Sequence, residues 1–195
     1  MSHPKAVDSE ILERFADIVA SSLRVGRERV TADAYLSDLG AESLDLLEIT
    51  MEVEDEFGII MPQKDVLQAA QDVFGPDVLV RDGLITEDGV KLLRCRLPAV
   101  DHDALVAGMP IADVNRVFER IGTWLRVIRG LLDDAPSACP SCAGALLKPL
   151  AGRQKCSMCA TEIDLPAGDD LNRRWLEEYL RREQALTSAE DTHLA

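Results

Sequence analysis

The sequence predicts a mainly α-helical protein with a small cysteine-rich module near its C-terminus. Aromatic residues make up only 4% of the chain, which favours aliphatic packing between helices over a β-sandwich. In several segments the apolar residues recur at steps of three and four, the spacing of one helix face. Two Cys-x-x-Cys pairs lie between residues 139 and 159 and indicate a separate small module.

Length and charge narrow the classes of function. The 195 residues suffice for one domain of ordinary size and a small second module. A hydrophobic content of 47% allows a packed core. The net charge of −14 argues against nucleic-acid binding, because phosphate backbones require clustered Lys and Arg. An acidic surface is instead suited to basic patches on partner proteins.

The first ten residues, "MSHPKAVDSE", lack the apolar run of a signal peptide. No segment is long enough to span a bilayer. We therefore expect a cytoplasmic protein without membrane association, in a compartment where thiols stay reduced.

The N-terminal helix is expected in "DSEILERFADIVASSLRV", where Ile11, Phe15 and Ile18 share one face. A loop follows over residues 26–42. The next helix runs from Ser43 to Phe57. At about 100° per residue, its core face comprises Leu46, Ile49, Thr50, Val53 and Phe57.

The opposite face of the 43–57 helix mixes apolar and acidic side chains. Leu44, Leu47 and Met51 lie there among five of the seven carboxylates found between Glu42 and Phe57, a stretch without Lys or Arg. This face is either a docking surface for another protein or the cover of a neighbouring segment of the chain.

A further helix is expected in "MPIADVNRVFERIGTWLRVIRGLL", where apolar residues from Ile111 to Ile128 repeat at helical spacing. Between the two helices lies a segment of about residues 64–108. It should contain a short helix, a "VLVRDGLI" hairpin, and a helix that Thr86 begins and Pro98 ends. This segment can cover a ligand, present a partner surface or enlarge the core.

The order of a helix, a long loop, "LGAESLD", an acidic helix and "FGIIMP" resembles the acyl carrier protein family. The family's Gly-x-Asp-Ser-Leu motif reads Gly40-Ala41-Glu42-Ser43-Leu44 here. The resemblance covers roughly residues 8–62 and resumes at Ile111, where the family's last helix should fall. It implies a four-helix bundle, here with residues 64–108 inserted.

The resemblance also implies a function. Family members are not enzymes; they hold acyl groups as thioesters on a 4′-phosphopantetheine arm, which a phosphopantetheinyl transferase attaches to the motif serine. Ser43 is then the attachment site. Enzymes with basic patches that load, modify and transfer the acyl group would bind the partner-facing positions, which are Glu42, Leu44, Asp45, Leu47, Glu48, Met51 and Glu54. The acidic residue before Ser43 points to fatty acid, polyketide or related biosynthesis rather than peptide synthesis.

The chemistry of Ser43 fits this implication. A phosphodiester at a helix N-terminus is stabilised by free N–H groups and the helix dipole. The alternative is that Ser43 only caps the helix; the third helical residue would then be Leu46, and no capping box would form. Glu42 replaces the usual Asp of the family motif and adds a methylene beside the site. We therefore expect modification to be less efficient or to require a dedicated transferase.

Four cysteines, Cys139, Cys142, Cys156 and Cys159, form two Cys-x-x-Cys pairs separated by thirteen residues. This pattern resembles a zinc ribbon, in which four thiolates close a tetrahedral structural site. Two disulfides are the alternative. A module of this size needs such a cross-link because it cannot form a sufficient core. Its weak balance of basic over acidic residues favours protein docking over nucleic acid.

The expected domain division places the helical domain at residues 1–133, a linker at 134–138, the zinc module with a C-terminal helix at 139–186, and a polar tail at 187–195. In the C-terminal helix, Leu171, Trp175 and Tyr179 form an apolar stripe that either packs on the ribbon or binds a partner groove.

Two functions follow. The first is an acyl carrier protein whose zinc module serves structure and partner docking. The second is an unmodified scaffold with the carrier fold, whose zinc ribbon mediates protein assembly or regulation.

Overall fold

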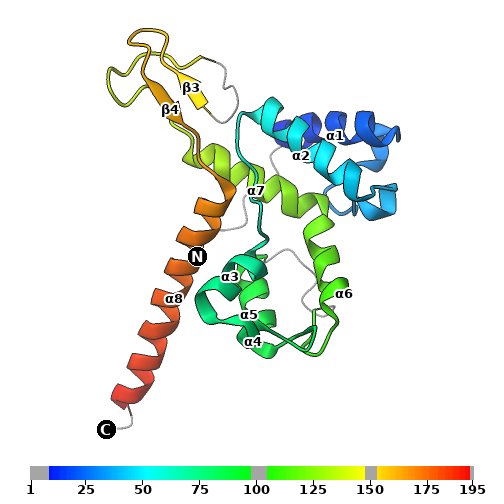
Figure 1. Ribbon diagram of the computed structural model, residues 1–195, viewed down its shortest axis with the longest axis vertical. Helices are drawn as coiled ribbons and strands as arrows, with labels where there is room; N and C mark the ends of the chain where they lie inside the picture. Colours follow the sequence, from blue (N-terminus) through cyan, green and yellow to red (C-terminus); the bar gives the residue numbers. More distant parts are fainter. Residues whose placement is uncertain (1–8, 98–104, 148–152, 194–195) are drawn as a thin grey trace.

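The computed structural model describes residues 9–97, 105–147 and 153–193. Figure 1 shows a helical bundle, a second group of short helices below it, a hairpin that carries the cysteines, and a long C-terminal helix. The described fold is mainly helical with a small cysteine-bearing hairpin, as the composition predicted.

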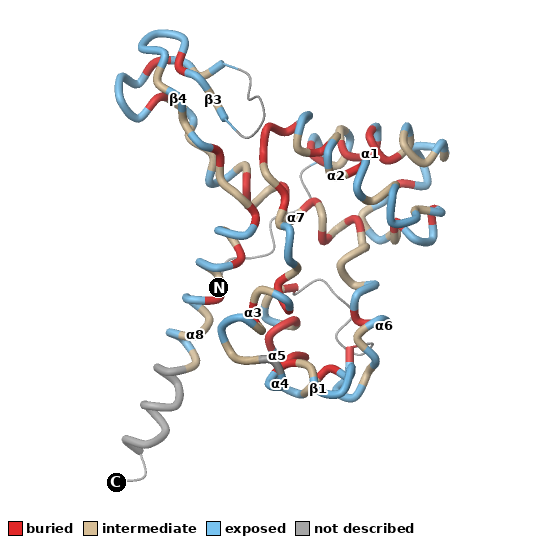
Figure 2. Tube along the Cα trace, viewed as in Figure 1, coloured by how far each residue is buried: buried red, intermediate tan, exposed pale blue. Residues whose placement is uncertain are grey.

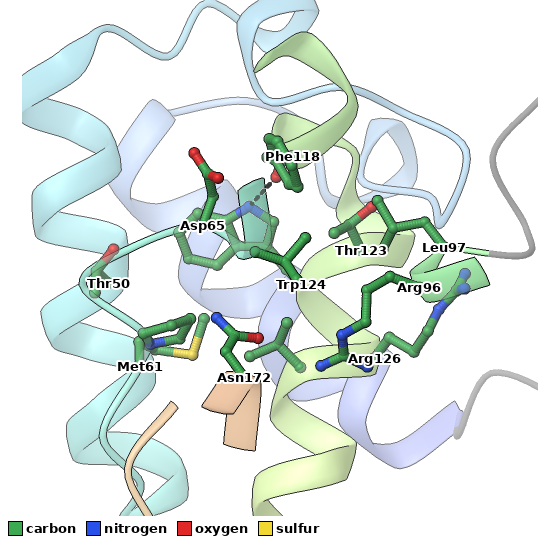
Figure 3. A pocket seen from close by; sticks show the side chains of 13 residues that line it. Thr50, Met61, Asp65, Arg96, Leu97, Phe118, Thr123, Trp124, Arg126 and Asn172 are labelled. Atoms are coloured by element: carbon green, nitrogen blue, oxygen red, sulfur yellow. Dashed lines mark hydrogen bonds between the residues drawn. The ribbon is translucent and has the colours of Figure 1, made fainter. Parts of the chain in front are cut away.

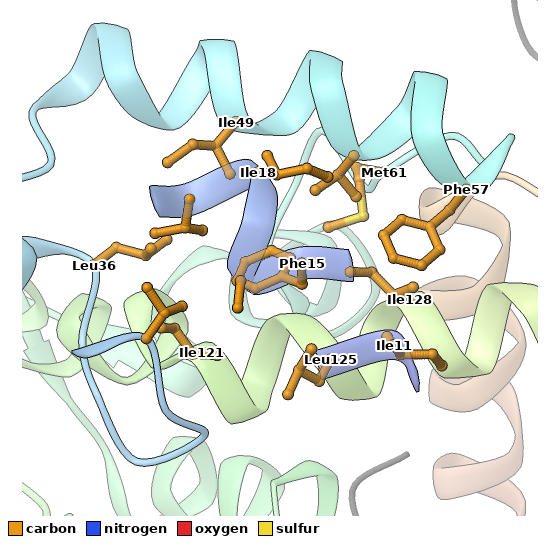
Figure 4. Packing of buried hydrophobic residues seen from close by; sticks show 14 of the residues in the cluster. Ile11, Phe15, Ile18, Leu36, Ile49, Phe57, Met61, Ile121, Leu125 and Ile128 are labelled. Atoms are coloured by element: carbon orange, nitrogen blue, oxygen red, sulfur yellow. The ribbon is translucent and has the colours of Figure 1, made fainter. Parts of the chain in front are cut away.

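Three long helices form the bundle, namely α1 (Ser9–Leu23), α2 (Ser43–Phe57) and α7 (Ile121–Asp134). Their facing sides share one core, in which Phe15, Ile49 and Ile128 are fully buried (Figure 4). The ring of Phe15 lies 5.7 Å from that of Trp124 on α7. The expected core face of α2 is confirmed, with Ile49, Val53 and Phe57 buried.

The loop between α1 and α2 contains two short 3-10 helices, η1 (Arg27–Arg29) and η2 (Ser37–Leu39). It is anchored in the bundle core by Val30, Leu36 and Leu39, which are all buried. This anchoring fixes the direction in which the chain enters α2.

The prediction of a single helix from residue 109 to 132 is wrong. The chain forms α6 (Ile111–Asn115), η3 (Arg116–Glu119) and α7 instead, and the break comes at Arg120, whose backbone is extended. The loop before α2 causes this break by pairing with the chain here. The N–H of Leu36 donates to the carbonyl of Glu119 at 3.0 Å, and the N–H of Ile121 donates to that of Ala34 at 2.9 Å.

The helix that closes the bundle therefore begins at Ile121, ten residues after the position expected from the resemblance. Apolar residues before the break serve another core: Val114 of α6 is fully buried with the side chains of the inserted segment. The apolar residues of α6 and α7 therefore follow one continuous helical spacing in the sequence, although the two helices pack in different cores.

The inserted segment forms a second hydrophobic core. It contains α3 (Val66–Phe74), α4 (Pro76–Leu79), the antiparallel strands β1 (Val80–Arg81) and β2 (Leu84–Ile85), and α5 (Glu87–Arg96). The predicted hairpin is confirmed, and so is the start of a helix at Thr86, whose hydroxyl accepts the N–H of Gly89 at 3.1 Å. Pro98, expected to end this helix, lies outside the described residues.

The C-terminal helix α8 (Gly168–His193) packs on the inserted segment and on α7, not on the hairpin as expected. Leu176 is buried in the second core, and the ring of Tyr179 lies 6.5 Å from that of Phe74. The reason is that the inserted segment offers apolar side chains for α8 to pack on. The hairpin is instead largely exposed (Figure 2). The helix continues to His193, through the first part of the expected polar tail.

The hairpin pairs β3 (Arg153–Lys155) with β4 (Glu162–Asp164) in antiparallel register, with Gln154 opposite Ile163. It lies beyond the C-terminal end of α2, whereas Ser43 begins the other end of that helix (Figure 1). Fifteen residues of helix place these ends about 20 Å apart. None of the helices in the described ranges combines the length and hydropathy that crossing a bilayer requires.

Candidate functional site

The backbone around Ser43 is shaped by Gly40, which ends η2 in a left-handed conformation with φ 95°. A side chain at this φ would be strained, so glycine suits the turn. The chain then extends at Glu42, with φ −103° and ψ 175°, and enters α2. This sequence of turns places Ser43 at the first position of the helix.

The N-cap of α2 is Glu42, not Ser43. Glu42 forms a capping box with Asp45, whose carboxylate accepts the N–H of Glu42 at 2.8 Å. The interpretation of Ser43 as the cap is therefore wrong, and so is the expectation that no capping box forms. Because the two acidic residues satisfy the helix start, the hydroxyl of Ser43 is not needed for it.

Ser43 is exposed, and its hydroxyl makes no hydrogen bond within the described part of the chain. It borders an open hollow that is also lined by Glu42, Leu46 and Glu119. An exposed hydroxyl at a helix N-terminus can accept a phosphoryl group, whose charge the helix dipole then stabilises.

Ion pairs hold the loop before Ser43 against the chain between α6 and α7. Arg120 pairs with Asp33, and Arg116 pairs with Asp38 while its guanidinium lies 4.9 Å from the centre of the Tyr35 ring. These contacts, together with the backbone pairing of residues 34–36, fix the entry to α2 from outside.

The outer face of α2 is free of other described segments. Leu44, Leu47 and Met51 are 80%, 58% and 59% exposed, so the interpretation that they cover a neighbouring segment is wrong. Glu42 and Glu48 are exposed beside them, and Asp45 is half-buried by its capping role. These side chains form one apolar and acidic surface, which we call the α2 outer face.

Glu54, the last of the expected partner-facing positions, lies differently. Its carboxylate accepts the N–H of Met61 at 2.8 Å, and the residue is half-buried. It therefore fastens the segment after α2 to the helix.

The four cysteine sulfurs converge. All four Sγ atoms lie within 4.8 Å of one another, with 3.6 Å between Cys139 and Cys159 and 3.5 Å between Cys142 and Cys156. A disulfide would bring two sulfurs to about 2.05 Å, and all four cysteines are free. Four sulfurs around zinc at about 2.3 Å each would stand about 3.8 Å apart in a tetrahedron. The spacing therefore fits one tetrahedral metal ion.

The two Cys-x-x-Cys turns have matching backbones. The N–H of Ala143 donates to the carbonyl of Cys139 at 2.7 Å, and the N–H of Ala160 donates to that of Cys156 at 3.1 Å. Both alanines have positive φ, 57° and 58°. Each turn thus brings its two thiols to the same side, which is how four ligands from two turns reach one centre.

Local donors favour the thiolate form in the second turn. Hydrogen bonding to Thr161 lowers the pKa of Cys159 to about 6. The N–H groups of Cys159 and Met158 lower the pKa of Cys156. For Cys142 the bond with the Gly144 backbone lowers the pKa, but the neighbouring thiols outweigh it and the pKa rises to about 12. Four cysteine sulfurs, once ionised, are a donor set that suits a metal such as zinc.

Sequence reasoning missed three features of these sites. It did not identify the Glu42 and Asp45 capping box, although acidic residues at N-cap and N3 were the available signal. It missed the role of Thr161 beside Cys159. It also missed two arginines, Arg96 and Arg126, which lie beside a cavity between the two cores; no motif marks them.

The comparisons with known proteins cover the part of the chain that contains Ser43. Residues 13–73 match the family model described as phosphopantetheine attachment site. An acyl carrier protein of Thermosynechococcus vestitus (strain NIES-2133 / IAM M-273 / BP-1) is 44% identical over 68 residues, which cover 33% of this chain and 84% of the relative. No solved structure matches the chain. The range matched by the family model ends inside α3, whereas α7 closes the bundle from beyond that range.

Proposed function

Because the chain belongs to the acyl carrier protein family, we propose that it carries acyl groups as thioesters on a 4′-phosphopantetheine arm attached to Ser43. The single observation that carries this proposal is the exposed hydroxyl at the first position of α2. It is not needed to cap the helix, because Glu42 and Asp45 form the capping box. In this step the Ser43 oxygen bonds to the phosphorus that carries the pantetheine arm in coenzyme A. The pyrophosphate bond breaks, adenosine 3′,5′-bisphosphate leaves, and a base of the transferase takes the hydroxyl proton. The thiol of the arm then bears the cargo.

The α2 outer face is proposed as the docking surface for the transferase and for the enzymes that load, modify and unload the arm. Its exposed Leu44, Leu47 and Met51 supply apolar contact, and the surrounding carboxylates complement basic patches. Such electrostatic contacts favour fast, transient association. The acidic Glu42 before Ser43 supports a place in fatty acid, polyketide or related biosynthesis.

The four cysteines are proposed to hold one structural zinc ion, supported by their mutual spacing. Four thiolates would fill the coordination sphere and leave no open position for catalysis. We propose that the module at residues 139–186, joined by the linker 134–138 to the helical domain at 1–133, serves for structure and protein docking. Its helix α8 would supply the structural part by packing on the helical domain, and its hairpin would supply the docking surface. Its place at the far end of α2 would let a partner bind there while an enzyme acts at Ser43.

The competing proposal is a scaffold that is never modified, in which the cysteine module mediates assembly. Incubation with coenzyme A and a broad-specificity phosphopantetheinyl transferase, followed by intact mass measurement, separates the two. The carrier gains the mass of one arm, Ser43→Ala gains none, and Ser37→Ala, which removes an exposed hydroxyl six residues away, gains it normally. An unchanged mass for the wild-type chain favours the scaffold.

A further inference from the structure

A cavity of about 190 Å³ lies where α2, the inserted segment, α7 and α8 meet (Figure 3). Much of its wall is apolar and includes Val66, Leu97, Phe118 and Trp124. An apolar cavity of about 150 Å³ holds a benzene molecule. The present cavity therefore has room for a small organic ligand.

Two arginines border the cavity, Arg96 from α5 and Arg126 from α7 (Figure 3). Both side chains are partly buried, and neither forms an ion pair with any residue in the described ranges. Arg96 lies over the ring of Trp175, with its guanidinium carbon 5.3 Å from the ring centre. Burial lowers the pKa of both, and each lies near another arginine, yet guanidinium stays charged in proteins.

Asp65 also borders the cavity but does not balance these charges. Its carboxylate accepts the N–H of Gln68 at 2.8 Å and caps α3. Figure 3 shows this carboxylate on the opposite side of the cavity from the two arginines. Within the described ranges, no carboxylate balances the positive charge on the arginine side of the cavity. Such a charge is costly in a partly desolvated site.

We propose that this cavity binds a small amphipathic carboxylate, whose head pairs with Arg96 and Arg126 and whose apolar body fills the space beside Trp124. Guanidinium groups form strong, directed hydrogen bonds with carboxylates, and burial strengthens them. The site does not depend on modification of Ser43. Thr50 in its wall is about 10 Å along α2 from Ser43, so the carboxylate can belong to a free acid or to the far end of an acyl group held on the arm.

Calorimetric titration with hexanoate and with neutral hexanamide tests the site. It uses the full-length Ser43→Ala protein, which cannot carry the arm. Hexanoate is expected to bind at least about tenfold more tightly than hexanamide, and Arg126→Gln is expected to remove most of this difference. Arg129→Gln, a change on the same helix outside the cavity, should leave it within about twofold. Equal affinities for the two ligands, or an unaltered preference in Arg126→Gln, would overturn the proposal.

Reversing the charge at residue 126 should create a new ligand preference, which a misfolded protein would not show. Arg126→Glu should lose affinity for hexanoate and acquire a preference for hexylammonium over hexanamide. Thermal unfolding and far-UV circular dichroism check that this variant is folded. A folded Arg126→Glu protein that still prefers hexanoate contradicts the assignment.

Loading the wild-type arm identifies the source of the carboxylate. If adipoyl loading blocks hexanoate binding more than hexanoyl loading does, the site takes the far end of the tethered cargo. If neither blocks it, the site takes a free acid; both outcomes support the site. Failure to load Ser43 would contradict the carrier function and would leave the hexanoate result intact.

Discussion

The Nη2 atom of Arg116 lies 2.6 and 2.8 Å from the two carboxylate oxygens of Asp38. This contact joins η3, far along the chain, to the turn that leads into Ser43. Because both side chains are more than half exposed, the pair should add little to global stability. We expect its effect to be local: the pair should hold the turn before Ser43 in one conformation.

We predict that Asp38→Asn and Arg116→Gln each lower the free energy of unfolding by less than about 1 kcal/mol. Amide exchange at Gly40 and Ala41 should nevertheless accelerate, because the turn loses its outer anchor. Hydrogen exchange followed by NMR measures this, with Arg27→Gln, which breaks an exposed pair with Asp17, as the control. Equal exchange in all three variants would show that the pair does not hold the turn.

The capping box gives a second prediction. Asp45→Ala should destabilise the chain by about 1 kcal/mol, since it leaves the N–H of Glu42 without its partner. Asp55→Ala, an exposed change at the other end of α2, serves as control and should cost less. Urea unfolding monitored by circular dichroism compares them, and equal midpoints would argue against a capping role.

Replacing Glu42 by Asp gives the chain the aspartate that the family motif has at this position. A shorter carboxylate is a better N-cap, so Glu42→Asp should stabilise α2 by a few tenths of a kcal/mol. We also predict faster modification of Ser43 by a broad-specificity transferase. The initial rate of arm transfer measures this; a slower rate in Glu42→Asp would mean that the extra methylene suits the modification.

Shortening a core side chain of α7 should cause a large loss of stability. Ile121 is fully buried where the chain resumes its helix after Arg120. Ile121→Ala should therefore cost about 2–5 kcal/mol. Leu132→Ala, on the same helix but only half-buried, should cost less. Chemical denaturation gives both values, and a loss for Ile121→Ala no larger than that for Leu132→Ala would contradict the full burial of Ile121 in the core.

The cysteine module predicts a dependence on pH. In the metal-free chain the pKa of Cys159 is lowered from 9.0 to about 6. Its ionisation therefore contributes stability that is fully present above pH 9 and lost as the pH falls through 6. Zinc should also dissociate on acidification, because protons compete for the thiolates. Thiol titration and zinc release measured against pH test this; release that is independent of pH would contradict thiolate ligation.

Local patterns in the sequence predicted the parts of the fold that depend on local chemistry. Apolar spacing identified α1 and α2, Thr86 marked the start of α5, and the cysteine spacing predicted one cluster of four sulfurs. The expected start of a helix at Ser43 is confirmed as well. These features require only residues that are near one another in the chain.

Features that depend on distant segments were not predictable in this way. The break at Arg120 arises from backbone pairing with residues 34–36, which no periodicity in α7 reveals. The position of α8 depends on an apolar surface that exists only after the inserted segment has folded around Leu93 and Val66. The meeting of Arg96 and Arg126 likewise requires both cores to be assembled.

The most direct test of the account is the state of Ser43 in protein purified from its native host. Peptide mass spectrometry should find a 4′-phosphopantetheine group on Ser43 and none on Ser37. A Ser43 that is unmodified in every preparation, under conditions where the host's other carriers are modified, would contradict the carrier function.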